Sequence, residues 1–286
     1  MACYHIAGHI LKGESPETIP GFSPFRYEGA VVSGKSVLCF RQGIALPDWE
    51  IAPQYRFQFE QFVCDFARQG VVYLFRMKPP EGSSLLLTIH SDGGVFQADT
   101  NIDSRFPVYA LRFALWLAFG VAALHRKTVA VHASTVMYGG KSVLFLGESG
   151  TGKSTHTGLW LKHIPGTELL NDDSPFINVS EGIRVYGSPW SGKTPCYKPV
   201  QTPIAAIVRL RQAASNTIRR LNGLESIGAL LPSCPPEFAC DPELSGYLYD
   251  ILSVVLQQTP VYSLACLPDA AAAELVFDTL KKDGCL

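Results

Sequence analysis

Several features that would place this protein in a specialised class are missing from its sequence. Lysine and arginine (24) nearly balance aspartate and glutamate (25), so the net charge of −1 lacks the basic excess typical of nucleic-acid-binding proteins. The eight cysteines form no Cys-x-x-Cys pair, and neither a zinc site nor a disulfide framework is indicated. We therefore expect reduced cysteines, a cytoplasmic location and no nucleic-acid partner.

Long hydrophobic runs are missing as well. The most apolar stretch, residues 113–124 (FALWLAFGVAAL), is preceded by Arg112 and followed by residues 125–127 (HRK). It is too short to span a bilayer and favours a buried helix. The first residues lack the long apolar core of a signal peptide. We expect no membrane partner.

What remains is the composition of a folded enzyme, with 47% hydrophobic and 17% charged residues. Residues 1–104 hold short β-rich runs separated by turn signals, which predict a mainly β, antiparallel accessory domain. Residues 105–286 begin with a helical segment and then alternate between strand-like and helical stretches. This alternation predicts an α/β domain.

The individual elements are expected at the following places. In the first domain, strands are predicted at residues 37–40, 55–59, 71–75 and 85–89. In the second, helices are predicted at residues 106–127, 153–163, 221–231, 243–258 and 269–282. Strands are predicted there at residues 129–131, 142–146, 204–210 and 261–266.

The pattern G-x-x-x-x-G-K-[ST], which is typical of phosphate-binding loops, occurs three times, starting at Gly29, Gly147 and Gly187. A working loop needs a buried strand before it and a helix after it. Only the Gly147 match has both, because residues 142–146 (SVLFL) are apolar and residues 153–163 contain no proline.

The other two matches lack this context. The segment that starts at Gly29 is predicted to be a hairpin whose turn is residues 33–36. The segment that starts at Gly187 is followed by Pro195 and Pro199, where a helix would be needed. Its residues 187–193 (GSPWSGK) are either a surface turn or a functional loop that binds an anion, with Trp190 stacking on a base or substrate.

We expect the Gly147 loop to hold the phosphates of ATP. Its backbone N–H groups and Lys153 would surround the phosphates, and the Ser154 hydroxyl would ligate Mg²⁺. The nucleotide-binding residues are therefore predicted to be Gly147, Glu148, Ser149, Gly150, Thr151, Gly152, Lys153, Ser154 and Thr155.

Three further features are candidates for chemistry. Asp172 and Asp173 follow Asn171, and adjacent carboxylates in a phosphate site can bind a metal and take a proton. A plain Asx turn that ends at Ser174-Pro175 is the alternative.

His132 precedes the strand that leads to the loop, and it is either a structural histidine or a group that orients a catalytic base. Arg209 and Arg211 end a predicted strand, where an arginine is either exposed or positioned to stabilise transferred phosphoryl charge. Of the two, we assign Arg211 to the catalytic set.

Taken in order, the segments VAVHAS, GGKSVLFLGESGTGKST and LLNDDSPFI resemble the catalytic core of HPr kinase/phosphorylase and its relatives. That core belongs to a superfamily shared with phosphoenolpyruvate carboxykinase. The resemblance covers roughly residues 125–215, and residues 187–193 resemble a segment of HPr-kinase-like proteins. It implies a P-loop kinase core, with Asp172 as the catalytic base, Asp173 as a Mg²⁺ ligand and His132 as a helper of the base.

The sequence therefore predicts an ATP- and Mg²⁺-dependent phosphotransferase that acts on a hydroxyl of a protein serine or of a small molecule. A nucleotide-binding regulatory module without phosphotransfer, or a carboxykinase-like enzyme, is the alternative. A homo-oligomer is compatible with the sequence, which leaves the oligomeric state open.

Overall fold

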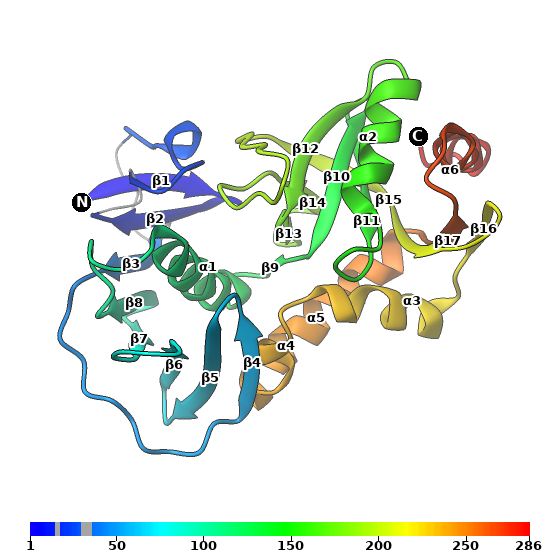
Figure 1. Ribbon diagram of the computed structural model, residues 1–286. Coiled ribbons are helices and arrows are strands. Elements are labelled where there is room, and N and C mark those ends of the chain that lie inside the picture. The colour runs from blue at the N-terminus through cyan, green and yellow to red at the C-terminus, as the bar shows by residue number, and fades with distance from the viewer. Residues whose placement is uncertain (15–17, 30–35) are drawn as a thin grey trace. The chain divides into compact units, whose positions relative to one another are not determined.

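The computed structural model describes residues 1–14, 18–29 and 36–286, and its contacts divide the chain into two compact units (Figure 1). The first unit contains residues 1–126 and 236–247, and the second contains residues 127–235 and 248–286. Both units are built on large β-sheets with helices, so the protein is mixed α/β. Contacts place helix α1 (Val108–Leu124) in the first unit, whereas the expected domain boundary at residue 104 precedes it.

The first unit contains a mixed sheet with the strand order β1-β2-β3-β8-β7-β6-β5-β4. The sheet is not purely antiparallel as expected, because β3 pairs in parallel with both β2 and β8. The predicted strands at 37–40, 55–59, 71–75 and 85–89 are present. The described strands are β1 (Ala2–Ile6), β2 (His9–Gly13), β3 (Ser36–Arg41), β4 (Tyr55–Phe59), β5 (Phe62–Gln69), β6 (Val72–Lys78), β7 (Leu85–Asp92) and β8 (Val95–Thr100).

Helix α1 is the buried apolar helix that the sequence predicts. It packs against β3, β7 and β8 of the first unit, and residues 117–124 are all buried. Because its apolar residues lie on every side rather than in one stripe, the helix is suited to a protein interior. In residues 1–14, 18–29 and 36–286, no helix has the length and apolarity to cross a membrane. The turn expected at residues 33–36 falls almost wholly outside the described residues.

A buried carboxylate organises the polar contacts of the first sheet. Asp65 is fully buried, and its oxygens accept hydrogen bonds from Arg56 (2.6 Å) and Arg76 (2.8 Å), with Lys78 at 3.4 Å. Arg76 also donates to the carbonyl of Trp49 and lies 4.0 Å from that ring. Burial alone raises the pKa of Asp65, but the hydrogen bonds from the two arginines outweigh it and lower the pKa to about 2.

We expect Asp65→Ala to destabilise the protein by about 3 to 5 kcal/mol, because it leaves the buried Arg76 guanidinium without its buried carboxylate partner. Urea denaturation at pH 7 measures this loss. Since the pKa of Asp65 is lower in the folded protein than in the unfolded chain, its contribution is complete above about pH 4 and is lost as the pH falls towards 2. A cost no larger than that of Asp48→Ala, which removes only an exposed partner of Arg76, would contradict this account.

The second unit contains a sheet in which β12, β10, β11 and β15 are neighbours in that order. Strand β15 is long: its first residues pair with β14, and its later residues run parallel to β11 on one side and β17 on the other. The described strands are β9 (Thr128–Ala130), β10 (Ala133–Tyr138), β11 (Lys141–Leu146), β12 (Glu168–Asp173), β13 (Phe176–Asn178), β14 (Arg184–Tyr186), β15 (Gln201–Gln212), β16 (Thr217–Arg220) and β17 (Val261–Cys266).

The four longer helices of the chain's second half agree with the prediction, and the short α4 was not predicted. They are α2 (Lys153–His163), α3 (Gly223–Leu230), the short α4 (Pro236–Ala239), α5 (Pro242–Gln258), which begins in the first unit, and α6 (Ala270–Lys282). Helices α2 and α6 cover one face of the second sheet. On that face Phe145, Trp160, Val208, Tyr262 and Val276 form part of a buried core. This core fixes α2 directly beside β11, so the turn between them is short and its position is determined.

His156 anchors α2 to that core as a neutral imidazole. It is 3% exposed, and its ring lies 4.7 Å from the ring of Phe145. Among the described residues, its Nε2 has no hydrogen-bond partner. Burial lowers the pKa of His156 to about 4, because the interior disfavours the charged ring.

The stability of the second unit should therefore fall in mild acid. Between pH 6.5 and pH 4 the unfolded chain binds a proton at His156 that the folded protein does not, at a cost of about 2 kcal/mol between pH 7 and pH 5. Urea denaturation at the two pH values measures this difference. His156→Phe should reduce the loss, and His163→Phe at the more exposed end of α2 should not. Equal losses in both variants would contradict the assignment.

Candidate functional site

The loop at Gly147 connects a buried strand to a helix, as the sequence predicts. Strand β11 ends at Leu146, and α2 begins at Lys153. Gly152 has a φ of +104°, a left-handed conformation that glycine adopts without strain. Among the described side chains none caps the start of α2, and its first turn contains no acidic residue. The N–H groups and the positive end of the helix dipole therefore face no competing side chain and suit an anion.

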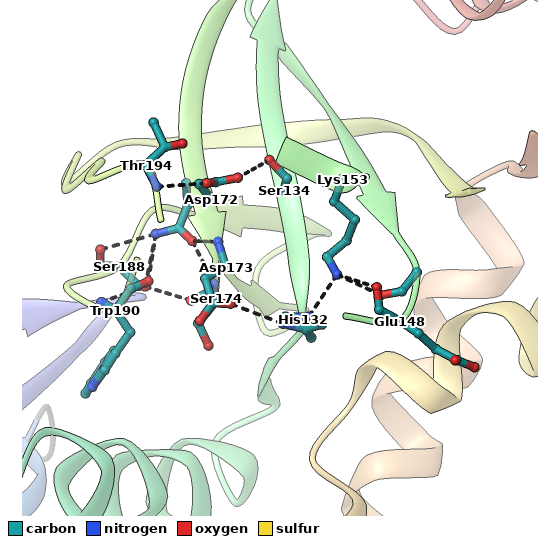
Figure 2. A network of polar contacts seen from close by, with 12 residues as sticks. His132, Ser134, Glu148, Lys153, Asp172, Asp173, Ser174, Ser188, Trp190 and Thr194 are labelled. Atoms are coloured by element: carbon teal, nitrogen blue, oxygen red, sulfur yellow. Dashed lines mark hydrogen bonds and ion pairs between the residues drawn. The ribbon is translucent and has the colours of Figure 1, made fainter. Parts of the chain in front are cut away.

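Lys153, His132 and Asp173 form a continuous chain of contacts beside this loop (Figure 2). The Lys153 ammonium lies 2.8 Å from His132 Nε2, and His132 Nδ1 lies 3.2 Å from Asp173 Oδ1. Because an ammonium only donates hydrogen bonds, Nε2 must accept, and the ring proton is on Nδ1, facing the carboxylate. His132 thus links the loop lysine to Asp173.

Lys153 is also held by the loop itself. Its ammonium donates to the carbonyls of Gly147 (2.8 Å) and Glu148 (3.2 Å), and the residue is 9% exposed. Burial lowers its pKa, Asp173 and Asp172 partly offset this effect by their negative charge, and the nearby Arg209 lowers the pKa further. An anion placed at the loop would supply the negative charge that this buried ammonium lacks.

The two adjacent aspartates point to opposite faces of the sheet. Asp172 pairs across the strands with Ser134, and Asp173 pairs with Ala133. Successive residues of a strand alternate between faces, so the two carboxylates have different surroundings. Asp173 has a side chain that is 41% exposed and lies next to His132, whereas Asp172 is 4% exposed.

Asp172 is held by a buried network on the α2 side of the sheet. Its Oδ1 accepts a hydrogen bond from Ser134 (2.7 Å), and its Oδ2 accepts one from the backbone N–H of Thr194 (3.1 Å). Ser134 in turn lies 2.9 Å from the hydroxyl of Thr157, one turn into α2. Asp172 therefore ties β12 to α2 and to the segment that contains Thr194.

The Asx turn that the sequence offered as an alternative is also present. The Asn171 side chain accepts hydrogen bonds from the N–H groups of Asp173 (3.0 Å) and Ser174 (2.8 Å). Its amide group donates to the carbonyls of Ser188 and Trp190. Asn171, rather than either aspartate, makes the turn, so both carboxylates remain available for other contacts.

The segment that starts at Gly187 is a wall of this site and not a second phosphate loop. No helix follows it in the described residues 192–200. Instead Ser191 bridges to Asp173, and the Gly192 N–H donates to the Asp172 carbonyl. Trp190 is 4% exposed and lies beside Phe176, so its ring is packed in the interior and is not available to stack on a base or substrate.

The structure brings together His132, Lys153 and Asp173, with Ser154 exposed at the start of α2, and it places Arg211 elsewhere. Arg209 is the arginine that influences Lys153, and it donates to the Ala229 carbonyl. Arg211 lines a small hollow with residues of β16 and β17.

The sequence did not single out Ser134, Thr157 or Thr194. A small hydroxyl residue in a buried strand or helix is a weak signal, because only the strand register shows which carboxylate it meets.

The oxygen atoms present suit Mg²⁺ bound mainly through phosphates. Mg²⁺ usually keeps several waters and takes one or two protein ligands in addition to substrate phosphates. Ser154 and the half-exposed Asp173 offer hard oxygen atoms of this kind. The described residues contain no cluster of three histidine, cysteine or acidic side chains that would hold a metal by themselves.

No protein-family model matches this chain, and no curated protein sequence does either.

Gly192→Ala should displace the segment beside the aspartates, because a Cβ atom there would lie 2.6 Å from the Asp172 carbonyl oxygen. We expect a loss of about 1 to 3 kcal/mol in stability and faster hydrogen exchange at the Thr194 amide. Urea denaturation and amide exchange measure the two effects. Gly158→Ala on α2, where a Cβ meets open space, should instead stabilise the protein. Unchanged exchange at Thr194 in Gly192→Ala would contradict the close packing.

Proposed function

We propose that this protein is an ATP- and Mg²⁺-dependent phosphotransferase of the HPr-kinase-like class that transfers a phosphoryl group to a hydroxyl. The chain of contacts from Lys153 through His132 to Asp173 carries the proposal. It joins a lysine suited to phosphate binding to a half-exposed carboxylate through a histidine of defined tautomer. Binding a nucleotide requires only the lysine and the loop, whereas moving a proton requires the carboxylate.

In this mechanism the loop binds the phosphates of ATP. The uncapped N–H groups at the start of α2 donate to phosphate oxygens. The Lys153 ammonium exchanges the carbonyls of Gly147 and Glu148 for the β- and γ-phosphates, which restores the charge balance that its burial disturbs. Ser154 would hold Mg²⁺, which supplies neutralisation of the phosphate charge when it is bound.

Asp173 is the base that this geometry favours, rather than Asp172, and this leaves Ser154 to hold Mg²⁺ in place of the Asp173 ligand that the resemblance implies. A general base must reach the hydroxyl that it deprotonates. Asp173 is half-exposed and is oriented by the Nδ1–H of His132, whereas Asp172 is buried, with each of its oxygens engaged by a donor. Asp172 would instead keep the 187–194 segment in place beside the acceptor.

The acceptor is a hydroxyl group, on a protein serine or on a small molecule. Transfer proceeds with the attacking and leaving oxygens roughly in line, so the acceptor approaches the γ-phosphate from the side of Asp173. The acceptor oxygen bonds to the γ-phosphorus and gives its proton to Asp173, the bond from the γ-phosphorus to the bridging oxygen breaks, and ADP leaves. Cytoplasmic ATP is the donor in this proposal.

Two substitutions test the proposal. Lys153→Ala should abolish MgATP binding in calorimetric titration, because it removes the ammonium at the phosphates. Asp173→Asn should keep MgATP binding but slow phosphoryl transfer at least about 100-fold, since it removes the base. Transfer is measured with γ-labelled ATP and a panel of hydroxyl-bearing peptides and metabolites.

Lys162→Ala, an exposed substitution near the end of α2, serves as the control and should behave as the unaltered protein. If the folded protein fails to bind MgATP, the proposal is wrong. If it binds MgATP but modifies no member of the panel, the outcome supports the nucleotide-binding regulatory module instead.

A further inference from the structure

The cross-strand pairing of the second unit places several side chains on the face that carries Asp173. Residues that pair directly across strands share a face of the sheet. One row runs from β12 to β16 through Asp173, Ala133, Leu146, Arg209, Ser263 and Arg219. The adjacent row contains Arg211, Ala265 and Thr217. Asp173 and three arginines therefore lie on one face, on opposite sides of β11.

The carboxyl ends of β11, β15 and β17 lie at the same edge of the sheet, because the three strands are parallel. In parallel α/β sheets, ligands bind at this edge. The loop at Gly147 follows β11, and Gln212 at the end of β15 donates to the Gly150 carbonyl at 3.3 Å. The end of β15 thus borders the phosphate loop itself.

Beside that border lies a hollow of about 120 Å³, lined by Arg211, Thr217, Ile218, Arg219, Ser263 and Ala265. Arg211 is exposed, and the guanidinium of Arg219 is fixed by two hydrogen bonds to Glu225 (2.7 and 3.0 Å). Planar guanidinium groups stack on aromatic ring systems, and hydroxyls such as those of Thr217 and Ser263 hydrogen-bond to bases and riboses.

The direction of phosphoryl transfer points to the same place. Because the acceptor and the leaving group lie on opposite sides of the γ-phosphorus, the remainder of the donor extends away from Asp173. Asp173 lies on β12, on one side of β11, and β15, β17 and β16 lie on the other side. With strands about 4.8 Å apart, the hollow lies roughly 10 to 15 Å from β11, a distance comparable to the length of a nucleoside triphosphate.

We propose that this hollow binds the nucleoside of the phosphate donor, with the heteroaromatic base stacked on the Arg211 guanidinium and hydrogen-bonded by Thr217 and Ser263. The inference rests on the proposed function and makes it more specific. It gives a place in the fold where the protein would distinguish a nucleoside triphosphate from pyrophosphate or another inorganic phosphate chain. It also gives Arg211 a part in binding the base instead of a part in catalysis.

The test compares MgATP with magnesium tripolyphosphate, which has the same number of phosphates but no nucleoside. Calorimetric titration of the full chain should show that ATP binds about tenfold more tightly. Arg211→Gln should remove that preference by weakening ATP binding about tenfold, without changing tripolyphosphate binding. Arg220→Gln is the matched control, because Arg220 is an exposed arginine whose partner across the strands, Tyr262, faces the α2 side. It should change neither affinity, and thermal melts check that both variants fold.

The outcomes separate the two proposals. If Arg211→Gln weakens both ligands equally, or neither, the hollow does not bind the nucleoside. If the unaltered protein binds ATP no more tightly than tripolyphosphate, the nucleoside site is wrong and the phosphate loop stands. If it binds neither ligand, the phosphotransferase proposal fails, and the nucleoside site fails with it.

Discussion

Alternation of side chains along β12 is the constraint on which this site depends. The strand presents Asp172 and Asp173 to opposite faces, and the two carboxylates meet different surroundings as a result. One lies in the packed layer between the sheet and α2, where hydroxyl and amide groups hold it. The other remains half-exposed beside a histidine. Two identical side chains, adjacent in the sequence, are thereby suited to a structural and a chemical task.

The order of the strands in the second sheet separates the two sides of the proposed reaction. Strands β12 and β10 lie on one side of β11, and β15, β17 and β16 lie on the other. The loop after β11 is central, so its lysine contacts His132 on the first side and is influenced by Arg209 on the second. In the proposed reaction, the attacking group lies on one side of β11 and the departing group on the other. The arrangement follows from the strand order.

Local signals in the sequence were enough to predict the elements that carry the loop. An apolar run followed by a proline-free segment predicted β11 and α2, and the long apolar stretch predicted α1. Strands β10 and β12 were not predicted, because polar residues such as Ser134 and Asn171 interrupt their apolar patterns. The structure buries both of these polar side chains. The opposite orientation of Asp172 and Asp173 follows from pairing between segments almost 40 residues apart. Similarly, Arg209 and Arg211 look equivalent in the sequence. In the structure Arg209 influences Lys153 of the loop, whereas Arg211 lies beside residues of β16.

The two hydroxyl groups next to Asp172, on Ser134 and Thr157, have too few hydrogens for all the contacts that they make. Ser134 and Thr157 each contribute one hydroxyl hydrogen. Their oxygens lie within hydrogen-bonding distance of each other, and in addition Ser134 contacts the Asp172 carboxylate and Thr157 contacts the Ser154 carbonyl. Because the Ser134 hydrogen points to Asp172, only the Thr157 hydrogen can join the two hydroxyls. Thr157 then has no hydrogen left for the Ser154 carbonyl. The contact with Asp172 on β12 thus sets the direction of the Thr157 hydroxyl hydrogen in the first turns of α2.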